Sequence, residues 1–182
     1  MGMLQERDDM LCASNSTNRI ASYFFNHIFI SKLLVEDTYN YDNVKRWTLK
    51  FDVFEKDKLF FPINILNRHW TCAVVFVNKK LICYYDSMGD SGDEYCNALR
   101  KWLVDEAFNK KGQVLEPEKW IIKKTTGVPR QTNDYDCGVF SIICMDFLSD
   151  DLLLQYSQRD MKYFRSKIAN DILRGSLNYD LE

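Results

Sequence analysis

The sequence is poor in glycine, proline and histidine, and it has no long apolar run. Seven glycines and three prolines among 182 residues favour long helices and strands over elaborate loops. No apolar stretch approaches the roughly 20 residues of a membrane span, and the opening MGMLQERDDM does not read as a secretory signal. The 24 basic and 26 acidic residues nearly cancel, which leaves no basic domain for nucleic acid. We therefore expect neither a membrane nor a nucleic acid as partner.

Disulfide frameworks and metal sites are disfavoured for similar reasons. Six cysteines are present, but none forms a CxxC pair, and most lie in apolar runs such as TCAVVF and SIICM. This pattern indicates reduced, buried thiols of an intracellular protein. Only two histidines, His27 and His69, are available, and neither belongs to a cluster with metal-ligand spacing. The sequence predicts no metal and no cofactor.

The high content of hydrophobic and aromatic residues indicates one folded domain. Hydrophobic residues make up 46% of the chain and aromatic residues 14%, and 182 residues are enough for a single core. The periodicity of apolar residues predicts an α+β domain with a central sheet covered by helices. We expect helices at 3–13, 22–34, 41–51, 93–110, 137–151 and 157–177, and strands at 58–66, 69–77, 81–88 and 119–125.

One cysteine differs from the other five in its surroundings. In TNDYDCGVFSIICMDFL, residues 132–148, a polar turn stops at Cys137 and a buried helix begins. A thiol at a helix N-terminus faces unpaired N–H groups that favour the thiolate, and Gly138 leaves room for a substrate backbone. The alternative is that Cys137 is simply another small buried residue. We expect the turn, including Asp136, to expose it.

A nucleophilic cysteine needs a base, and the base needs a group that orients it. His27 lies in an apolar helical pattern and reads as an ordinary helix histidine. His69 lies where a loop enters a strand, and the next strand ends at Asp86. A hairpin that closes near residues 78–80 places the two at the same end, about two residues out of register and within side-chain reach. Alternatively, Asp86 is a turn residue that ends a strand.

These residues together suggest acyl transfer. Cys137 would act as nucleophile, His69 as general base and later acid, and Asp86 would fix the histidine tautomer. The developing oxyanion needs donors, and the nearby side-chain amides are those of Gln131 and Asn133. The backbone N–H of Cys137 would be a second donor.

The motifs RHW, YYDSMG and VPRQTNDYDCG, in this order, resemble those of the Ulp/SENP family of ubiquitin-like-protein proteases, most closely its SUMO-specific members. The segments FFNHIFISKL and DMKYFRSKIANDIL extend the resemblance over nearly the whole chain. It implies a papain-like cysteine protease fold, with a central, mostly antiparallel sheet flanked by helices. It also implies that residues 1–182 form a single catalytic domain and act as a monomer.

The resemblance also implies roles for particular residues. His69, Asp86 and Cys137 would be the catalytic triad, with Gln131 as the oxyanion amide. Three further residues would bind substrate: Trp70 would line a narrow tunnel for a Gly-Gly tail, Gly138 would let that tail come close, and Arg46 would contact the ubiquitin-like body. From the residues alone, Trp70 also fits a core aromatic and Arg46 a solvated basic residue.

The function implied is cleavage after the C-terminal Gly-Gly of SUMO, for release from target lysines and for precursor maturation. NEDD8-type substrates and a catalytically weak SUMO-binding module are the alternatives. The family places such proteins in the nucleus or cytoplasm. Arg130 and Asp134 depart from the family pattern without touching the triad. The family's upstream Trp-Leu-Asn-Asp segment is missing here, so we expect weaker catalysis than from a version extended upstream.

Overall fold

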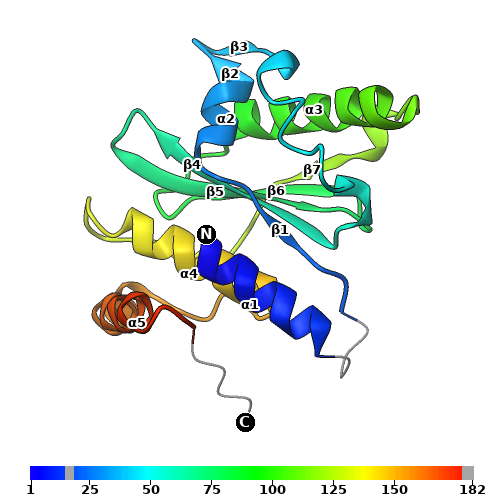
Figure 1. The fold of residues 1–182 in the computed structure, drawn as a ribbon. Helices are drawn as coiled ribbons and strands as arrows, with labels where there is room; N and C mark the ends of the chain where they lie inside the picture. Colours follow the sequence, from blue (N-terminus) through cyan, green and yellow to red (C-terminus); the bar gives the residue numbers. More distant parts are fainter. Residues whose placement is uncertain (15–18, 178–182) are drawn as a thin grey trace.

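The computed structural model describes residues 1–14 and 19–177, which build a mixed sheet between two layers of helices (Figure 1). Five strands form the sheet in the order β1-β4-β5-β6-β7, and β2 pairs with β3 in a separate two-stranded sheet. None of the described helices is long and apolar enough to cross a bilayer. The strands are β1 (Tyr23–Phe24), β2 (Leu34–Val35), β3 (Thr38–Tyr39), β4 (Lys58–Ile65), β5 (His69–Phe76), β6 (Leu81–Tyr85) and β7 (Ile121–Lys123). The helices are α1 (Gly2–Ala13), α2 (Ile28–Leu33), α3 (Asp93–Lys111), α4 (Cys137–Ser149) and α5 (Met161–Arg174), with 3₁₀ turns η1 (Tyr41–Asn43), η2 (Val53–Glu55), η3 (Pro117–Lys119) and η4 (Gln158–Asp160).

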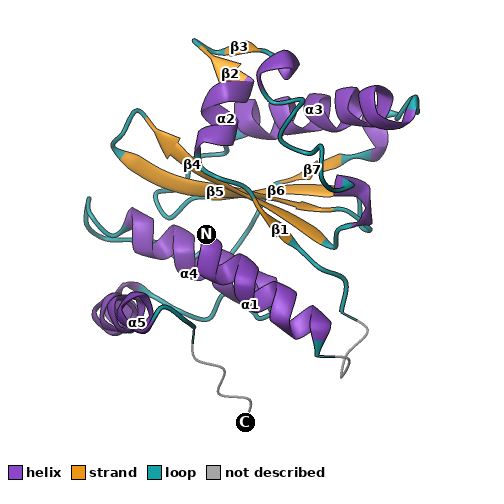
Figure 2. Cartoon of the chain, viewed as in Figure 1, coloured by secondary structure: helices purple, strands orange, loops and turns teal. Residues whose placement is uncertain are grey.

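The two faces of the sheet are covered by different helices. Helices α2 and α3 lie on one face, α1 and α4 lie on the other, and α5 lies outside α4 (Figure 2). Successive residues of a strand point to opposite faces. In β4, therefore, Phe61 packs with Trp102 of α3, whereas Phe60 packs with Cys144 of α4. Both layers are needed to bury the sheet, which explains why its strands read as nearly continuous apolar runs.

The expected α+β class and most of the expected elements are confirmed. Two expected helices are wrong. Residues 22–34 form the short strand β1 and the short helix α2, and residues 41–51 form only η1 followed by turns. Aromatic residues in β1 and α2 pack into the same core, so the apolar spacing in this segment reflects burial rather than a single helical face.

The sheet is mixed, and most of its residue pairs are antiparallel, as the family resemblance implied. The central strands β4, β5 and β6 are antiparallel, but the edge strands β1 and β7 each pair parallel to their neighbour. The hairpin of β5 and β6 pairs Cys72 with Tyr85 and Phe76 with Leu81. This register brings the first residue of β5, His69, to the end of the sheet where β6 leads into Asp86, as expected.

Glycines in the left-handed conformation flank helix α3 at both ends, but the surroundings of only one of them are crowded. Gly92 has φ +59°, and an added Cβ would lie 2.3 Å from Cγ of the Tyr84 ring. Gly112 has φ +63°, and an added Cβ would meet open space. The two positions separate the cost of backbone strain from the cost of a steric clash.

We expect Gly92→Ala to lower the free energy of unfolding by about 3 kcal/mol, because strain and overpacking add. Gly112→Ala, the matched control, should lose only about 1 kcal/mol from strain. Urea denaturation of both variants measures the difference. Equal losses would mean that the Tyr84 ring moves aside without cost.

Candidate active site

A histidine and a carboxylate meet at one end of the sheet. Nε2–H of His69 donates to Oδ1 of Asp86 at 2.7 Å. Asp86 is buried, with 4% of its surface exposed, and it also accepts the backbone N–H groups of Met88 at 2.7 Å and Asp90 at 3.0 Å. These three bonds fix the carboxylate and orient the imidazole. They leave Nδ1 as the ring nitrogen for a reaction partner.

The N-terminus of α4 lies against the start of β5, beside this pair. A Cβ on Gly138 would be 3.6 Å from Cδ1 of Trp70, the residue after His69. One turn later, Oγ of Ser141 donates to the backbone oxygen of Thr71 at 3.1 Å. Cys137, the first residue of α4, is therefore held at the end of the sheet that carries His69.

The sequence suggested that the polar turn exposes Cys137, but the structure shows that it does not. Cys137 is 6% exposed and Asp136 only 3%. Asp136 is buried because its carboxylate is fully engaged, by Asn133 Nδ2 (2.7 Å), Gln158 Nε2 (2.7 Å) and Arg165 Nε (2.7 Å). The turn folds inward around these bonds, and Cys137 lines a groove on the surface.

The Gln131 amide is fixed by the loop that follows β6. Its Oε1 accepts the hydroxyl of Ser87 at 2.6 Å, and its backbone N–H donates to the Ser87 carbonyl at 3.1 Å. Its Nε2 donates to the carbonyl of Asn133 at 2.5 Å. The same loop holds Asp86, so the predicted oxyanion amide and the predicted orienting carboxylate share one support.

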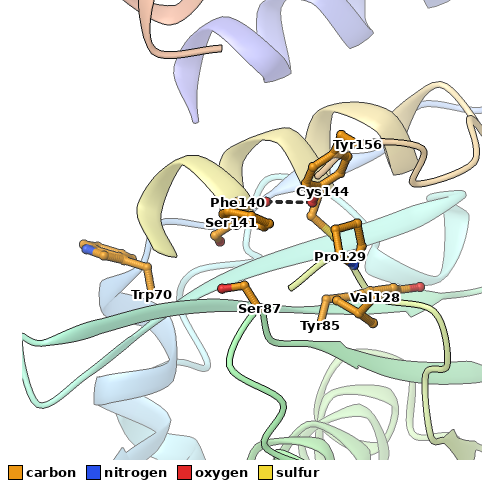
Figure 3. A pocket seen from close by; sticks show the side chains of 9 residues that line it. All are labelled: Trp70, Tyr85, Ser87, Val128, Pro129, Phe140, Ser141, Cys144 and Tyr156. Carbon is orange, nitrogen blue, oxygen red and sulfur yellow. Dashed lines mark hydrogen bonds between the residues drawn. The ribbon is translucent and has the colours of Figure 1, made fainter. Parts of the chain in front are cut away.

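The space beneath the first turns of α4 is almost filled. Figure 3 shows Trp70, Tyr85 and Ser87 from the sheet side of this space and Ser141 and Cys144 from the helix side. The cavity between them measures only about 10 Å³. Such packing fixes the height of α4 above the sheet, and with it the position of the residue at its N-terminus.

An open groove of about 410 Å³ runs over Cys137 and Gly138. Trp70 forms part of its wall, and apolar residues of α4 and α5 form much of the rest. His27 is exposed just before α2 and packs edge-on against Trp70, with ring centroids 5.4 Å apart. We expected an ordinary helix histidine, whereas His27 stands at the N-cap of α2 and contacts the Trp70 wall of the groove.

Arg46 is not brought to this site. It is exposed in the turns after η1, and the backbone carbonyl of its neighbour Lys45 accepts a hydrogen bond from Nζ of Lys110 in α3 at 2.8 Å. Arg46 thus belongs to the helical layer on the face of the sheet opposite α4. Within residues 1–14 and 19–177, no group of three or more His, Cys, Asp or Glu side chains is placed to hold a metal ion.

Burial disfavours several of the other cysteines as nucleophiles. It raises the pKa of the thiols of Cys83 and Cys144, and it raises that of Cys96 to about 12. Cys12 is partly exposed, yet burial and the nearby Asp8 carboxylate raise its thiol pKa as well. These four thiols are therefore poorly suited to attack a substrate at neutral pH.

Sequence reasoning missed the supporting residues of the site. Ser87, Gln158 and Arg165 hold the predicted residues in place, through partners 44, 22 and 29 positions away in the chain. The serine stands directly after Asp86, which is the only local sign of its role. Nothing in the local sequence marks the other two.

Comparison with known proteins gives the family of this chain. Residues 3–177 match the Ulp1 protease family, C-terminal catalytic domain. The chain belongs to this family, and the resemblance drawn from its motifs is confirmed.

Individual relatives agree with the family. Ubiquitin-like-specific protease 1A of Arabidopsis thaliana is 35% identical over 179 residues, which cover 96% of this chain and 35% of the relative. Sentrin-specific protease 2 of Homo sapiens is 33% identical over 159 residues, which cover 86% of this chain and 26% of the relative. The solved C-terminal Ulp1 protease domain, in complex with Smt3, the yeast ortholog of SUMO, is 25% identical with a TM-score of 0.72, covering 94% of this chain and 75% of that one. The chain thus spans about a third or less of these two curated relatives.

The Asp136 carboxylate should make stability depend on pH. Burial acts to raise its pKa, but the hydrogen bonds from Asn133, Gln158 and Arg165 outweigh burial and hold the pKa below the ordinary value of 3.8. A depressed pKa stabilises the fold above the ordinary value, and this contribution is lost as the pH falls through the folded-state pKa.

We expect Asp136→Asn to lower the free energy of unfolding by about 2 kcal/mol at pH 7, since charged hydrogen bonds are lost. The difference from the wild type should shrink between pH 5 and pH 2. Urea denaturation at several pH values measures it, with Asp134→Asn, an exposed neighbour in the same turn, as control. A difference that stays constant with pH would contradict this assignment.

Proposed function

We propose that the chain is a thiol-dependent protease and isopeptidase that cleaves after the C-terminal Gly-Gly of SUMO. The observation that carries the proposal is the His69–Asp86 pair, hydrogen-bonded at 2.7 Å, at the end of the sheet where α4 begins with Cys137. Membership of the Ulp1 family supports the reaction class. The relatives named for sentrin and crystallised with Smt3 support the substrate class.

The arrangement suits acyl transfer in two halves. His69 takes the proton of Cys137 at Nδ1, and the thiolate attacks the glycine carbonyl carbon. The oxyanion is stabilised by the Gln131 amide and the backbone N–H of Cys137. His69 then gives its proton to the departing lysine amine, the C–N bond breaks, and a thioester remains.

Water completes the reaction. His69 accepts a proton from the water that attacks the thioester, and the tetrahedral intermediate collapses. The C–S bond breaks, the glycine carboxylate leaves, and the thiol of Cys137 is restored. Asp86 stays ionised throughout and stabilises the imidazolium form of His69.

The groove supports a substrate tail without side chains. Trp70 offers a flat aromatic wall beside Cys137, and the missing side chain at Gly138 lets an extended backbone approach the helix N-terminus. Glycine residues can lie flat against this wall and bring their backbone close to the thiol. In this proposal the domain has a papain-like architecture, acts as a monomer in the nucleus or cytoplasm, and contacts the ubiquitin-like body through surfaces that include Arg46.

We expect Cys137→Ala to abolish cleavage while it leaves folding and SUMO binding intact. The measurement is release of a fluorogenic amine from the C-terminal Gly-Gly of SUMO, NEDD8 and ubiquitin, with Cys12→Ala as the control thiol. Cleavage of SUMO alone is the expected result. Preference for NEDD8 would mean that NEDD8, and not SUMO, is the substrate. SUMO binding without any turnover would identify a binding module.

Asp86→Asn should reduce kcat by roughly 10³ to 10⁴-fold, because the amide favours the wrong histidine tautomer. Both carboxylate oxygens of Asp86 accept N–H groups, so an asparagine NH₂ also faces a donor. Thermal unfolding of the same variant corrects for any loss of folded protein. A loss of only two- to three-fold would make Asp86 a structural turn residue.

A further inference from the structure

Asp136 occupies the N-cap position of α4, yet it does not cap the helix. Its carbonyl accepts the first helical hydrogen bond, from the N–H of Phe140 at 3.0 Å. Aspartate is among the best N-cap residues, because its carboxylate can accept the N–H groups of the first turn. Here the carboxylate makes no such bond. It points away from the helix and toward α5.

The second half of the chain holds the carboxylate in this orientation. From α5, Arg165 donates through Nε (2.7 Å) and a terminal nitrogen (2.5 Å) to Oδ1 of Asp136, and the terminal nitrogen also donates to the carbonyl of Tyr135 at 2.9 Å. From η4, Gln158 donates to Oδ2, and it accepts the N–H of Thr132 at 2.8 Å. Two elements outside the site therefore hold the turn that carries Cys137.

We propose that Arg165 is a positioning residue for Cys137, a role that rests on the proposed function. It holds the Asp136 carboxylate away from the first turn of α4 and offsets its negative charge. The N–H groups of that turn are then left for the Cys137 thiolate and for the oxyanion of the reaction.

The physical reason is competition for one helix end. A capping carboxylate would use the N–H groups that stabilise the thiolate, and it would place a like charge one residue away from the sulfur. A nearby like charge disfavours the ionised form of a group. The other charged or titratable groups around Cys137 are His69 from β5, with Asp86 behind it, and Tyr135 in the turn.

The test is the pH dependence of alkylation at Cys137 by iodoacetamide, followed by peptide mapping. Arg165→Gln removes the cation and both hydrogen bonds at Oδ1 of Asp136, while Asn133 and Gln158 still hold Oδ2. The carboxylate charge is then no longer offset, so the midpoint should rise by about one pH unit and the rate at pH 7 should fall about tenfold. The matched control is Arg159→Gln, which removes an equal charge at an exposed position of η4 and leaves the bonds to Asp136 in place. It should leave the midpoint unchanged.

A second substitution separates electrostatics from folding. In the double variant Asp136→Asn with Arg165→Gln, the carboxylate is gone, so the midpoint should return to within about 0.3 pH unit of wild type. Arg165→Lys should give an intermediate midpoint, because it keeps the charge and loses the paired bonds. An unchanged midpoint in Arg165→Gln, or a double variant shifted as far as the single one, would overturn the proposal.

Alkylation does not require turnover, so this result is independent of the substrate. If the midpoint shifts as expected but SUMO is not cleaved, the proposed function fails and the positioning role remains as a property of the thiol. If SUMO is cleaved but the midpoint does not move, the positioning role alone fails.

Discussion

Antiparallel pairing of β5 with β6 is the constraint on which the site depends. It fixes the distance between the strand that begins at His69 and the strand that leads into Asp86, and backbone N–H groups of the following loop then hold the carboxylate. To act as a base, a histidine oriented in this way also needs a nucleophile at the correct distance from the sheet. The packing of α4 on β5, through Gly138 and Ser141, sets the distance of Cys137 from the sheet.

The segment from Gln131 to Cys137 is held from two sides. Ser87 ties its first residue to the sheet, and Arg165 ties its last turn to α5. Chemical groups from the sheet, the turn and the helix therefore share a common frame, although they come from distant parts of the chain. Preorganisation of this kind limits the rearrangement needed when charge develops during a reaction.

Local relations could be read from the sequence, whereas distant ones could not. The pair of His69 and Asp86 follows from the register of a short hairpin, and both strands of that hairpin begin where they were predicted, although β6 ends three residues earlier. The bond between Asp136 and Arg165 joins residues 29 positions apart, and no periodicity encodes it. The error at 22–34 has a related cause, because apolar residues of a strand and a helix that enter one core can imitate a single helical face.

The short edge strands have a consequence for the behaviour of the sheet in a crowded solution. Strand β1 contains two residues and β7 three, so these strands pair only with Leu59 and Phe60 of β4 and with residues 81–83 of β6. Such brief edge strands, of which β7 also ends at the charged Lys123, give a strand from another molecule little to pair with. The central strand β5, which has a neighbour on each side, is thereby kept from edge-to-edge pairing with another molecule.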